Sequence, residues 1–373
     1  MNTEELLRHT DIYFRRAKQT LLAKDLNPWV NIQVFIRKGP GILDGINHVV
    51  WGLEGILPED SRIYSLRDND HYEPGETVMN IIAPAQSIIE WETIYLGILS
   101  QHVTANNGVY PRDSDILEAM KRVKEAVGDR MVMYFGARHT HPDNNIHMSE
   151  LALKAGLDGA ATEAGAEVMG VKPSGTIPHA LEAILSEHYG EEDIVAETVA
   201  AFHETMPEDI PRIALVDYYN RETWDTYRCL VRLGANLDGI RIDTCGENIM
   251  EGGAYGIQKY HDGTGVTTRG VMAVRDLLDK YPDFSQKIYL SSGFSDYRKV
   301  EAFNQVEKET GKRLYDGIGA GFLDGMWTAT ADIVAVADDP DRIDFMSGPV
   351  KWSYIHHKVG RPPKPNPRLE RRI

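Results

Sequence analysis

The sequence contains only two cysteines, Cys229 and Cys245, among its 373 residues. A single pair cannot build the framework of several disulfides that stabilises small secreted domains, and it cannot supply a four-cysteine zinc site. We therefore expect no zinc, and we expect a protein that works in a reducing compartment.

Positive charge is also scarce. The chain has 40 Lys and Arg residues against 56 Asp and Glu residues, which gives a net charge of −16. Binding to nucleic acids depends on clustered cations that displace counterions, so we do not expect it here. Small anionic substrates remain compatible with this charge, because a cleft can concentrate positive potential inside a negative protein.

Long apolar runs are missing as well. No stretch approaches the roughly 20 residues that cross a bilayer, so no contact with a membrane is expected. The first 16 residues, MNTEELLRHTDIYFRR, lack the apolar core of a signal peptide. These absences favour a cytoplasmic protein.

The chain is longer than one compact core usually needs, which predicts two domains. Residues 1–106 are expected to form an α/β sandwich domain, completed by the basic, Pro-rich tail at 341–373. Its predicted elements are an amphipathic helix at 3–23, β-prone runs at 30–36, 49–51, 62–65 and 76–82, and a long helix at 87–106.

Residues 107–340 have a different pattern, in which short apolar runs alternate with helix-like segments. Such alternation predicts a parallel sheet buried on both faces, either closed into a barrel or open and doubly wound. We favour an irregular α/β barrel of about seven strands, because no Gly-rich dinucleotide fingerprint follows the first strand. The expected strands are 131–135, 166–171, 212–217, 238–243, 287–292, 314–319 and 332–337, with a further short one at 158–162.

The carboxyl ends of these strands carry the groups that bind ligands in parallel α/β folds. Two of the ends are turns of small residues, Ser292-Gly293 and Gly319-Ala320-Gly321, where bare backbone N–H groups can approach a phosphate. Either turn alone is as well explained by a tight strand–helix connection. As neighbours they favour phosphate binding.

Charged side chains follow other strands. Arg138 and Arg241 offer planar forks suited to carboxylate or phosphate, although surface ion pairs would also explain them. Asp217 and Asp243 can hold Mg²⁺ through water, and their alternative role is helix capping or a structural pair with the arginines. Together, these arginines, aspartates and small-residue turns suit a phosphorylated substrate that carries a metal ion.

The segments SGTIPHAL (174–181) and FGARHTHP (135–142) resemble the nicotinate phosphoribosyltransferases, in particular their shorter archaeal-type members. The resemblance covers most of the chain. It includes HTDIYFRR (9–16), YEPGETVMNI (72–81), ETIYLGILSQ (92–101) and GIRIDTCGEN (239–248). The family fold, an α/β sandwich domain beside an irregular barrel of about seven strands, agrees with the pattern described above.

The resemblance implies roles for individual residues. His179 matches a histidine that ATP phosphorylates in ATP-coupled members. Arg138 matches a contact of phosphate or ring carboxylate, Arg241 a residue that lines the pyridine and ribose, and Asp243 a contact of ribose or Mg²⁺. Tyr13 matches an aromatic ring donated by the partner subunit of a homodimer. The remaining expected substrate contacts are His139, Lys172, Ser174, Thr176 and Asp217.

The implied reaction transfers the phosphoribosyl group of phosphoribosyl pyrophosphate (PRPP) to nicotinate, giving nicotinate mononucleotide and pyrophosphate for NAD biosynthesis. Quinolinate and nicotinamide remain alternative substrates, and ATP coupling remains open. Three other classes also stay open: a metal-dependent hydrolase using His139 and His141, a Schiff-base aldolase using Lys172, and a non-catalytic nucleotide sensor.

Overall fold

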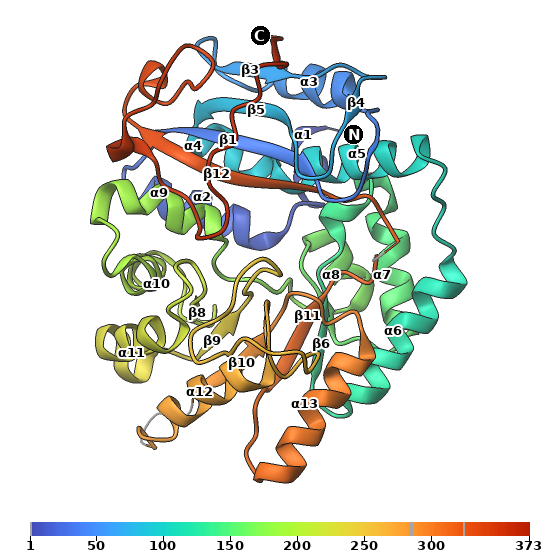
Figure 1. Cartoon of the computed structure of the whole chain (residues 1–373), viewed down its shortest axis with the longest axis vertical. Coiled ribbons are helices and arrows are strands. Elements are labelled where there is room, and N and C mark those ends of the chain that lie inside the picture. The colour runs from blue at the N-terminus through green and yellow to red at the C-terminus, as the bar shows by residue number, and fades with distance from the viewer. Residues whose placement is uncertain (1, 283–285, 324) are drawn as a thin grey trace.

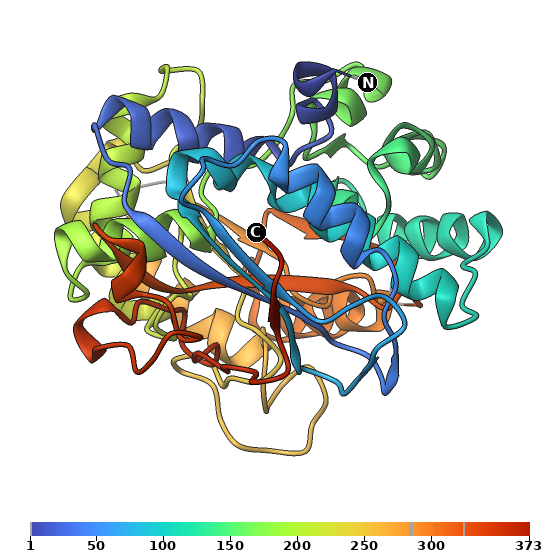
Figure 2. The same cartoon turned by 90° about the horizontal axis from the view of Figure 1, so that it is seen from above.

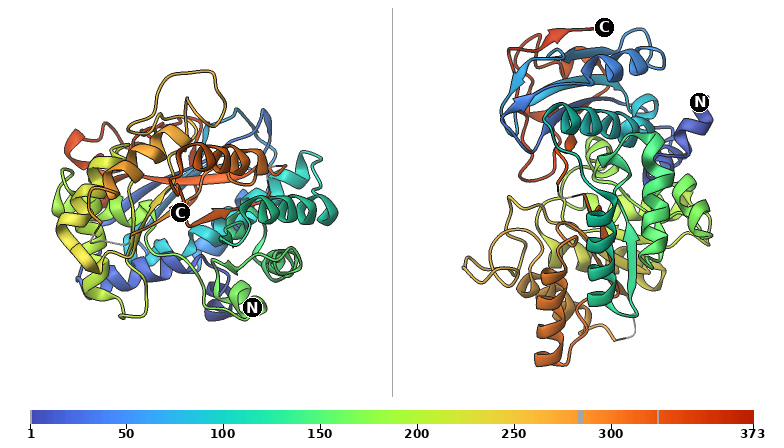
Figure 3. Two further views of the ribbon diagram at one scale, coloured as in Figure 1. Left: turned by 90° about the horizontal axis from the view of Figure 1, so that it is seen from below. Right: turned by 90° about the vertical axis from the view of Figure 1, so that its right-hand side faces the viewer.

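The computed structural model describes residues 2–282, 286–323 and 325–373. It contains an antiparallel sheet of five strands, a parallel sheet of six strands and a small two-stranded ribbon of β2 (Gly41–Ile42) and β4 (His71–Tyr72). Figure 1 shows the antiparallel sheet above the parallel one, and the right-hand view of Figure 3 shows the two layers from the side.

The antiparallel sheet joins segments that lie far apart in the chain. Its strand order is β12 (Ala329–Ala337), β1 (Trp29–Ile36), β5 (Thr77–Pro84), β3 (Arg62–Ser65) and β13 (Glu370–Arg371). Every residue of β5 is buried. Seen from above in Figure 2, the long strands lie side by side and the C-terminus ends over them. The sheet is therefore completed by residues from the end of the sequence.

The parallel sheet has the order β7 (Gly159–Ala160), β6 (Met131–Tyr134), β11 (Gly317–Ala320), β10 (Lys287–Leu290), β9 (Gly239–Ile242) and β8 (Ile213–Leu215). The helices of this region are α6 (Asp113–Val127), α7 (Asn145–Lys154), α8 (Glu163–Met169), α9 (His179–Tyr189), α10 (Ile194–Thr205), α11 (Glu222–Leu233), α12 (Thr268–Leu278) and α13 (Tyr297–Thr310). Helices cover the strands in the views of Figures 1 and 3, as parallel strands require.

The edges of the parallel sheet are linked by an irregular segment instead of a seventh strand. The Ser174 amide donates to the Ala160 carbonyl of β7 at 3.0 Å, and the Thr176 hydroxyl donates to the Ile213 carbonyl of β8 at 2.8 Å. Within the described ranges, strand pairing does not close the sheet into a ring. The mixed α/β fold is confirmed, and the parallel sheet has six strands where about seven were expected.

Three predicted strands are wrong as placed. Residues 166–171 lie mostly in α8, which Thr162 caps at its start and which ends at Gly170 with a positive φ. Residues 49–51 lie in α3 (Ile46–Glu54), whose buried side chains follow the helical period. Residues 332–337 form part of β12, a strand of the antiparallel sheet.

The two helices predicted at 3–23 and 87–106 are both interrupted. Residues 3–23 form α1 (Thr3–Leu7) and α2 (Ile12–Ala23), and residues 87–106 lie in α4 (Ala85–Ile88), a 3₁₀ turn and α5 (Glu92–Asn106). No helix in the described part of the chain has the length and apolar character to span a bilayer.

Candidate active site

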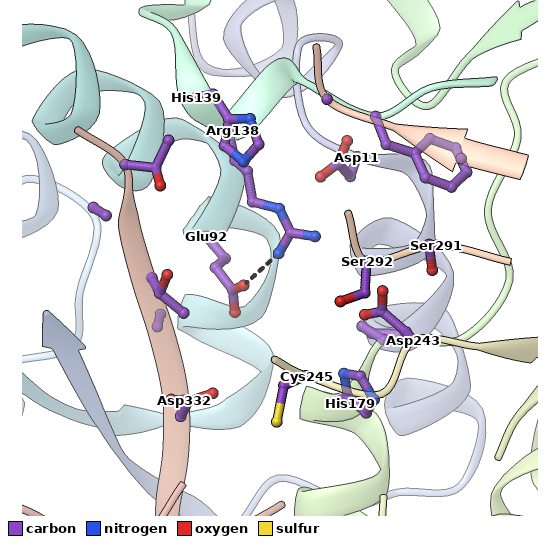
Figure 4. A pocket seen from close by; sticks show the side chains of 18 of the residues that line it. Asp11, Glu92, Arg138, His139, His179, Asp243, Cys245, Ser291, Ser292 and Asp332 are labelled. Atoms are coloured by element: carbon purple, nitrogen blue, oxygen red, sulfur yellow. Dashed lines mark ion pairs between the residues drawn. The ribbon is translucent and has the colours of Figure 1, made fainter. Parts of the chain in front are cut away.

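A cavity of about 480 Å³ lies between the carboxyl ends of the parallel strands and the antiparallel sheet (Figure 4). Segments that follow β6, β9, β10 and β11 contribute to its wall, as do β12 and residues 358–361 of the tail. The cavity therefore sits where parallel α/β folds place their ligands.

Most of the predicted site residues line this one cavity. They are Tyr13, Arg138, His139, His179, Arg241, Asp243, Ser292, Gly293, Gly319, Ala320 and Gly321. These residues come from α2, α9, β9, β11 and the segments that follow β6, β9, β10 and β11. The fold therefore brings together groups that the sequence separates by up to about 300 positions.

Four predicted residues do not line the cavity. Ser174 and Thr176 form the backbone link between β7 and β8. The Lys172 side chain is 84% exposed, and its ammonium pairs with Asp209 at 2.9 Å. A Schiff-base lysine must be partly desolvated and must face the substrate, so the position of Lys172 does not support the aldolase alternative. Asp217 lies behind His179 and is completely buried.

Arg138 faces a group of carboxylates at one end of the cavity. Its Nη1 atom lies 3.6 Å from Oε1 of Glu92 (dashed in Figure 4). Burial alone would lower the pKa of Arg138, but Tyr13, Asp11 and Glu92 outweigh it and raise this pKa. Burial raises the pKa of Glu92 to about 8, against the opposing effect of Arg138. Arg138 is thus a fixed cation beside a carboxyl that is largely protonated at neutral pH.

This raised pKa predicts a pH effect on stability. The folded protein holds the Glu92 proton between the ordinary pKa of 4.5 and about 8, whereas the unfolded chain releases it. Stability should therefore fall as pH rises from about 5 to about 8. Glu92→Gln should remove a contribution on the order of 1–3 kcal/mol to this fall. Denaturant unfolding at several pH values measures the difference. Glu54→Gln, at an exposed site, should leave the pH dependence intact.

Tyr13 is held in the cavity by its own chain. The Ile12 amide donates to the Ala161 carbonyl at 2.8 Å, which fixes the start of α2 against the end of β7. The Arg241 guanidinium carbon lies 5.8 Å from the centre of the Tyr13 ring. Within a single chain the ring thus lines this cavity, and the donation of Tyr13 to a partner subunit stays a prediction.

His139 and His141 point to different places. His139 lines the cavity, and burial, Arg138 and Arg37 lower its pKa to about 3, so the ring is neutral. His141 packs its ring 5.9 Å from the ring of His48. Among the residues that the structure describes, no group of three or more His, Cys, Asp or Glu side chains is placed to hold a metal ion. The metal-dependent hydrolase therefore finds no support in this geometry.

The turn Ser292-Gly293 follows β10 and forms part of the cavity wall. Gly319 and Ala320, predicted as a turn, are the last two residues of β11, and they line the wall together with Gly321. Ser292 and Gly293 have φ values of 67° and 80°, a left-handed conformation that turns the backbone sharply. The ammonium of Lys299, a residue that the sequence analysis missed, donates to the Ser292 carbonyl at 2.8 Å. Burial lowers the pKa of Lys299 to about 8. At Gly321, a Cβ atom would lie 2.6 Å from the His139 ring, so a side chain there would displace that ring.

His179 is part of a buried charged group. Its Nε2 atom lies 3.1 Å from Oδ1 of Asp217 and 2.9 Å from the ammonium of Lys358, which also contacts the other oxygen of Asp217. Burial alone would raise the pKa of Asp217, but Lys358 and His179 hold it well below its usual range. Asp217 does not line the cavity and both of its oxygens have partners, so this position gives no support to its predicted role of holding Mg²⁺ through water.

Sequence reasoning missed a second set of cations at the cavity wall. Arg37 and Arg361 each contact Glu247 at 3.1 Å, and Arg361 lies 3.9 Å from Asp332. The position of Arg37 directly after the β-prone run 30–36 was the available signal. The local sequence of the tail does not indicate that Lys358 and Arg361 line the cavity, because they reach it only through long-range contacts of the folded chain.

Comparison with known proteins supports this picture. Residues 11–103 match the sequence model of the quinolinate phosphoribosyl transferase N-terminal domain. A nicotinate phosphoribosyltransferase of Mycobacterium tuberculosis is 26% identical over 178 residues, or 48% of this chain and 37% of that protein. The match thus spans about a third of the length of that curated relative.

Two solved structures resemble most of the chain. A nicotinate phosphoribosyltransferase from Porphyromonas gingivalis, 13% identical, has a TM-score of 0.61, covering 88% of this chain and 90% of its own. A Saccharomyces cerevisiae protein that bears the same enzyme name, 15% identical, has a TM-score of 0.62, covering 90% and 94%. These likenesses show the fold, and with the sequence match they confirm the resemblance seen in the motifs.

Proposed function

Because the chain shares its fold and part of its sequence with nicotinate phosphoribosyltransferases, we propose that it transfers the phosphoribosyl group of PRPP to nicotinate. The products are nicotinate mononucleotide and pyrophosphate, and the reaction serves NAD biosynthesis. One observation carries the proposal: Arg138, Arg241, Tyr13, His179 and two small-residue turns line a single cavity.

In this proposal, Arg138 binds the carboxylate of the pyridine ring, and Tyr13 and Arg241 contact the ring itself. The turns at 291–293 and 319–321 receive the phosphates through backbone N–H groups. The pyridine nitrogen forms a bond to the anomeric carbon while the bond from that carbon to the pyrophosphate oxygen breaks. The nitrogen has a free lone pair, so the site needs no base, and positioning and charge stabilisation supply the rate.

Magnesium fits this cavity through Asp243. Its carboxylate lines the wall, and Mg²⁺ is commonly held by one or two carboxylates together with substrate phosphates. When bound, the ion would neutralise charge on the leaving pyrophosphate. Coupling to ATP through phosphorylation of His179 is a further part of the proposal.

The acidic groups of the cavity favour nicotinate over its alternatives. Asp11, Glu92 and Asp332 line the wall, and burial raises the pKa of each. Quinolinate would bring its second carboxylate beside these groups, where the nearby cations Arg37 and Arg361 are already paired with Glu247 and Asp332. Nicotinamide would leave the Arg138 guanidinium without a matching charge.

The direct test is an assay of pyrophosphate release with PRPP, Mg²⁺ and one pyridine at a time, with and without ATP. We expect kcat/KM for nicotinate to exceed that for quinolinate or nicotinamide by about 100-fold or more, as unpaired buried polar groups predict. EDTA should abolish the release. Equal rates with quinolinate would contradict the substrate, and no release with any pyridine would contradict the transferase.

A further inference from the structure

A segment of the tail, residues 356–361, is fixed against the region of the parallel sheet. The Val359 amide donates to the Tyr218 carbonyl at 2.9 Å, and Asn248 Nδ2 donates to the Val359 carbonyl at 2.8 Å. His356 Nδ1 lies 2.8 Å from the Ser186 hydroxyl. Lys358 lies between these anchors, and its side chain is 8% exposed. Hydrogen bonds of His356 and Val359 therefore hold the chain on both sides of Lys358.

The Lys358 ammonium has three contacts within hydrogen-bonding distance. They are Oδ2 of Asp217, Nε2 of His179 at 2.9 Å and the backbone carbonyl of Asp243 at 3.4 Å. An ammonium has three N–H donors and no lone pair, so all three partners must accept. Nε2 can accept only when it carries no proton. The shorter contact, 2.9 Å to Lys358, favours a neutral His179 ring with its proton on Nδ1 over the competing tautomer in which Nε2–H donates to Asp217 Oδ1 at 3.1 Å.

The charges around the ring agree with this assignment. Burial alone would lower the pKa of Lys358, but Asp217 and Asp243 outweigh it, so the ammonium stays charged. Burial, and then Lys358, lower the pKa of His179 below its ordinary value, against Asp217 and Asp243. Cys245 also lines the cavity, with a thiol whose pKa is raised by burial. The buried charge of Asp217 is balanced by Lys358 and does not require an imidazolium.

We propose that Lys358 is a positioning residue that holds His179 in the Nδ1–H tautomer and thereby makes it a hydrogen-bond donor toward the cavity. The role of this tautomer rests on the proposed function, in which Nδ1–H donates a hydrogen bond to an oxygen of the leaving pyrophosphate. The contacts of His179 with Asp217 and Lys358 both use Nε2, so Nδ1 is the nitrogen left for a ligand.

While Lys358 contacts Nε2, His179 cannot act as a nucleophile. Attack on ATP needs a ring nitrogen with a free lone pair facing the cavity, which means moving the proton from Nδ1 to Nε2. Nε2–H would then donate to Asp217 Oδ1, which already lies 3.1 Å away. Lys358 must leave Nε2 for this to happen, because two donors cannot share the contact. Lys358 thus selects between a donor state and a nucleophilic state of one histidine.

The test is ¹⁵N NMR of histidine-labelled protein at neutral pH without substrates, since protonated and unprotonated ring nitrogens have separate chemical shifts. His179→Gln identifies the His179 signals among those of the 13 histidines. In the unmodified protein we expect Nδ1 protonated and Nε2 unprotonated. Lys358→Met should move the proton to Nε2 or protonate both nitrogens. Lys358→Arg should retain Nδ1–H, because it keeps a charged donor.

A matched control is Lys351→Met, which removes an exposed tail lysine and should leave the His179 signals unchanged. A protonated Nε2 in the unmodified protein would overturn the proposal, and this result needs no variant to fold. An unchanged tautomer in folded Lys358→Met would overturn it too. Because no substrate is present, either result is independent of the transferase assay.

Discussion

Arg138→Met is expected to lower kcat/KM for nicotinate by about 100-fold or more. The guanidinium lines the cavity beside Glu92 and is the cation placed to receive the ring carboxylate. Losing one partner of a buried charged pair costs about 2–5 kcal/mol, and each 1.4 kcal/mol is a factor of ten. Steady-state kinetics with nicotinate varied at saturating PRPP measures the effect, which should fall mainly on KM for nicotinate.

A matched control for this variant is Arg130→Met. Arg130 forms a similarly enclosed pair with Glu307 at 2.6 Å but does not line the cavity. It should lower stability and leave kcat/KM nearly unchanged. If a folded Arg138→Met protein kept the original kinetics, the proposed contact with the carboxylate would be refuted.

Gly97→Ala should both destabilise the protein and impair the site. A Cβ atom at Gly97 would lie 2.3 Å from the Thr140 carbonyl oxygen and 3.4 Å from that of Ala137. These are backbone atoms of the segment that carries Arg138 and His139, so no side-chain rotation relieves the clash. Such overpacking costs about 1–3 kcal/mol, and a shift of about 1 Å in a positioning group can cost about 100-fold in rate.

Unfolding by denaturant and kcat/KM, measured on the same preparation, test this prediction. Gly52→Ala is the control, because Gly52 lies within α3 and nothing comes within 4 Å of its added Cβ. It should raise stability by about 0.5–1 kcal/mol through helix propensity and leave activity unchanged. Equal stability changes in the two variants would mean that α5 does not restrain the 136–141 segment.

Most strands of the parallel sheet could be predicted because each is a short run with an apolar centre that ends in polar or small residues. Residues 131–135 and 238–243 are examples, and their positions carried the prediction of Arg138, Arg241 and Asp243 as neighbours. Parallel strands share one carboxyl edge, so local patterns suffice to place these groups together.

Other features depend on pairing that local sequence does not encode. Residues 332–337 have the composition of a buried strand, but only the antiparallel register with β1 decides to which sheet they belong. Residues 166–171 were wrongly predicted as a strand although local signals for a helix were present, because Thr162 and Gly170 are residues that commonly cap helices. Lys358 could not be predicted as a site residue, because a basic, Pro-rich tail gives no local sign of burial.

The tail segment at 356–361 has a consequence for biosynthesis of the protein. It follows every strand of the parallel sheet in the chain, so a ribosome has made all six before Lys358 exists. Until then Asp217 has no ammonium beside it, and the enclosed carboxylate must stay hydrated or take up a proton. The cation that balances Asp217 is therefore missing until translation has passed Lys358.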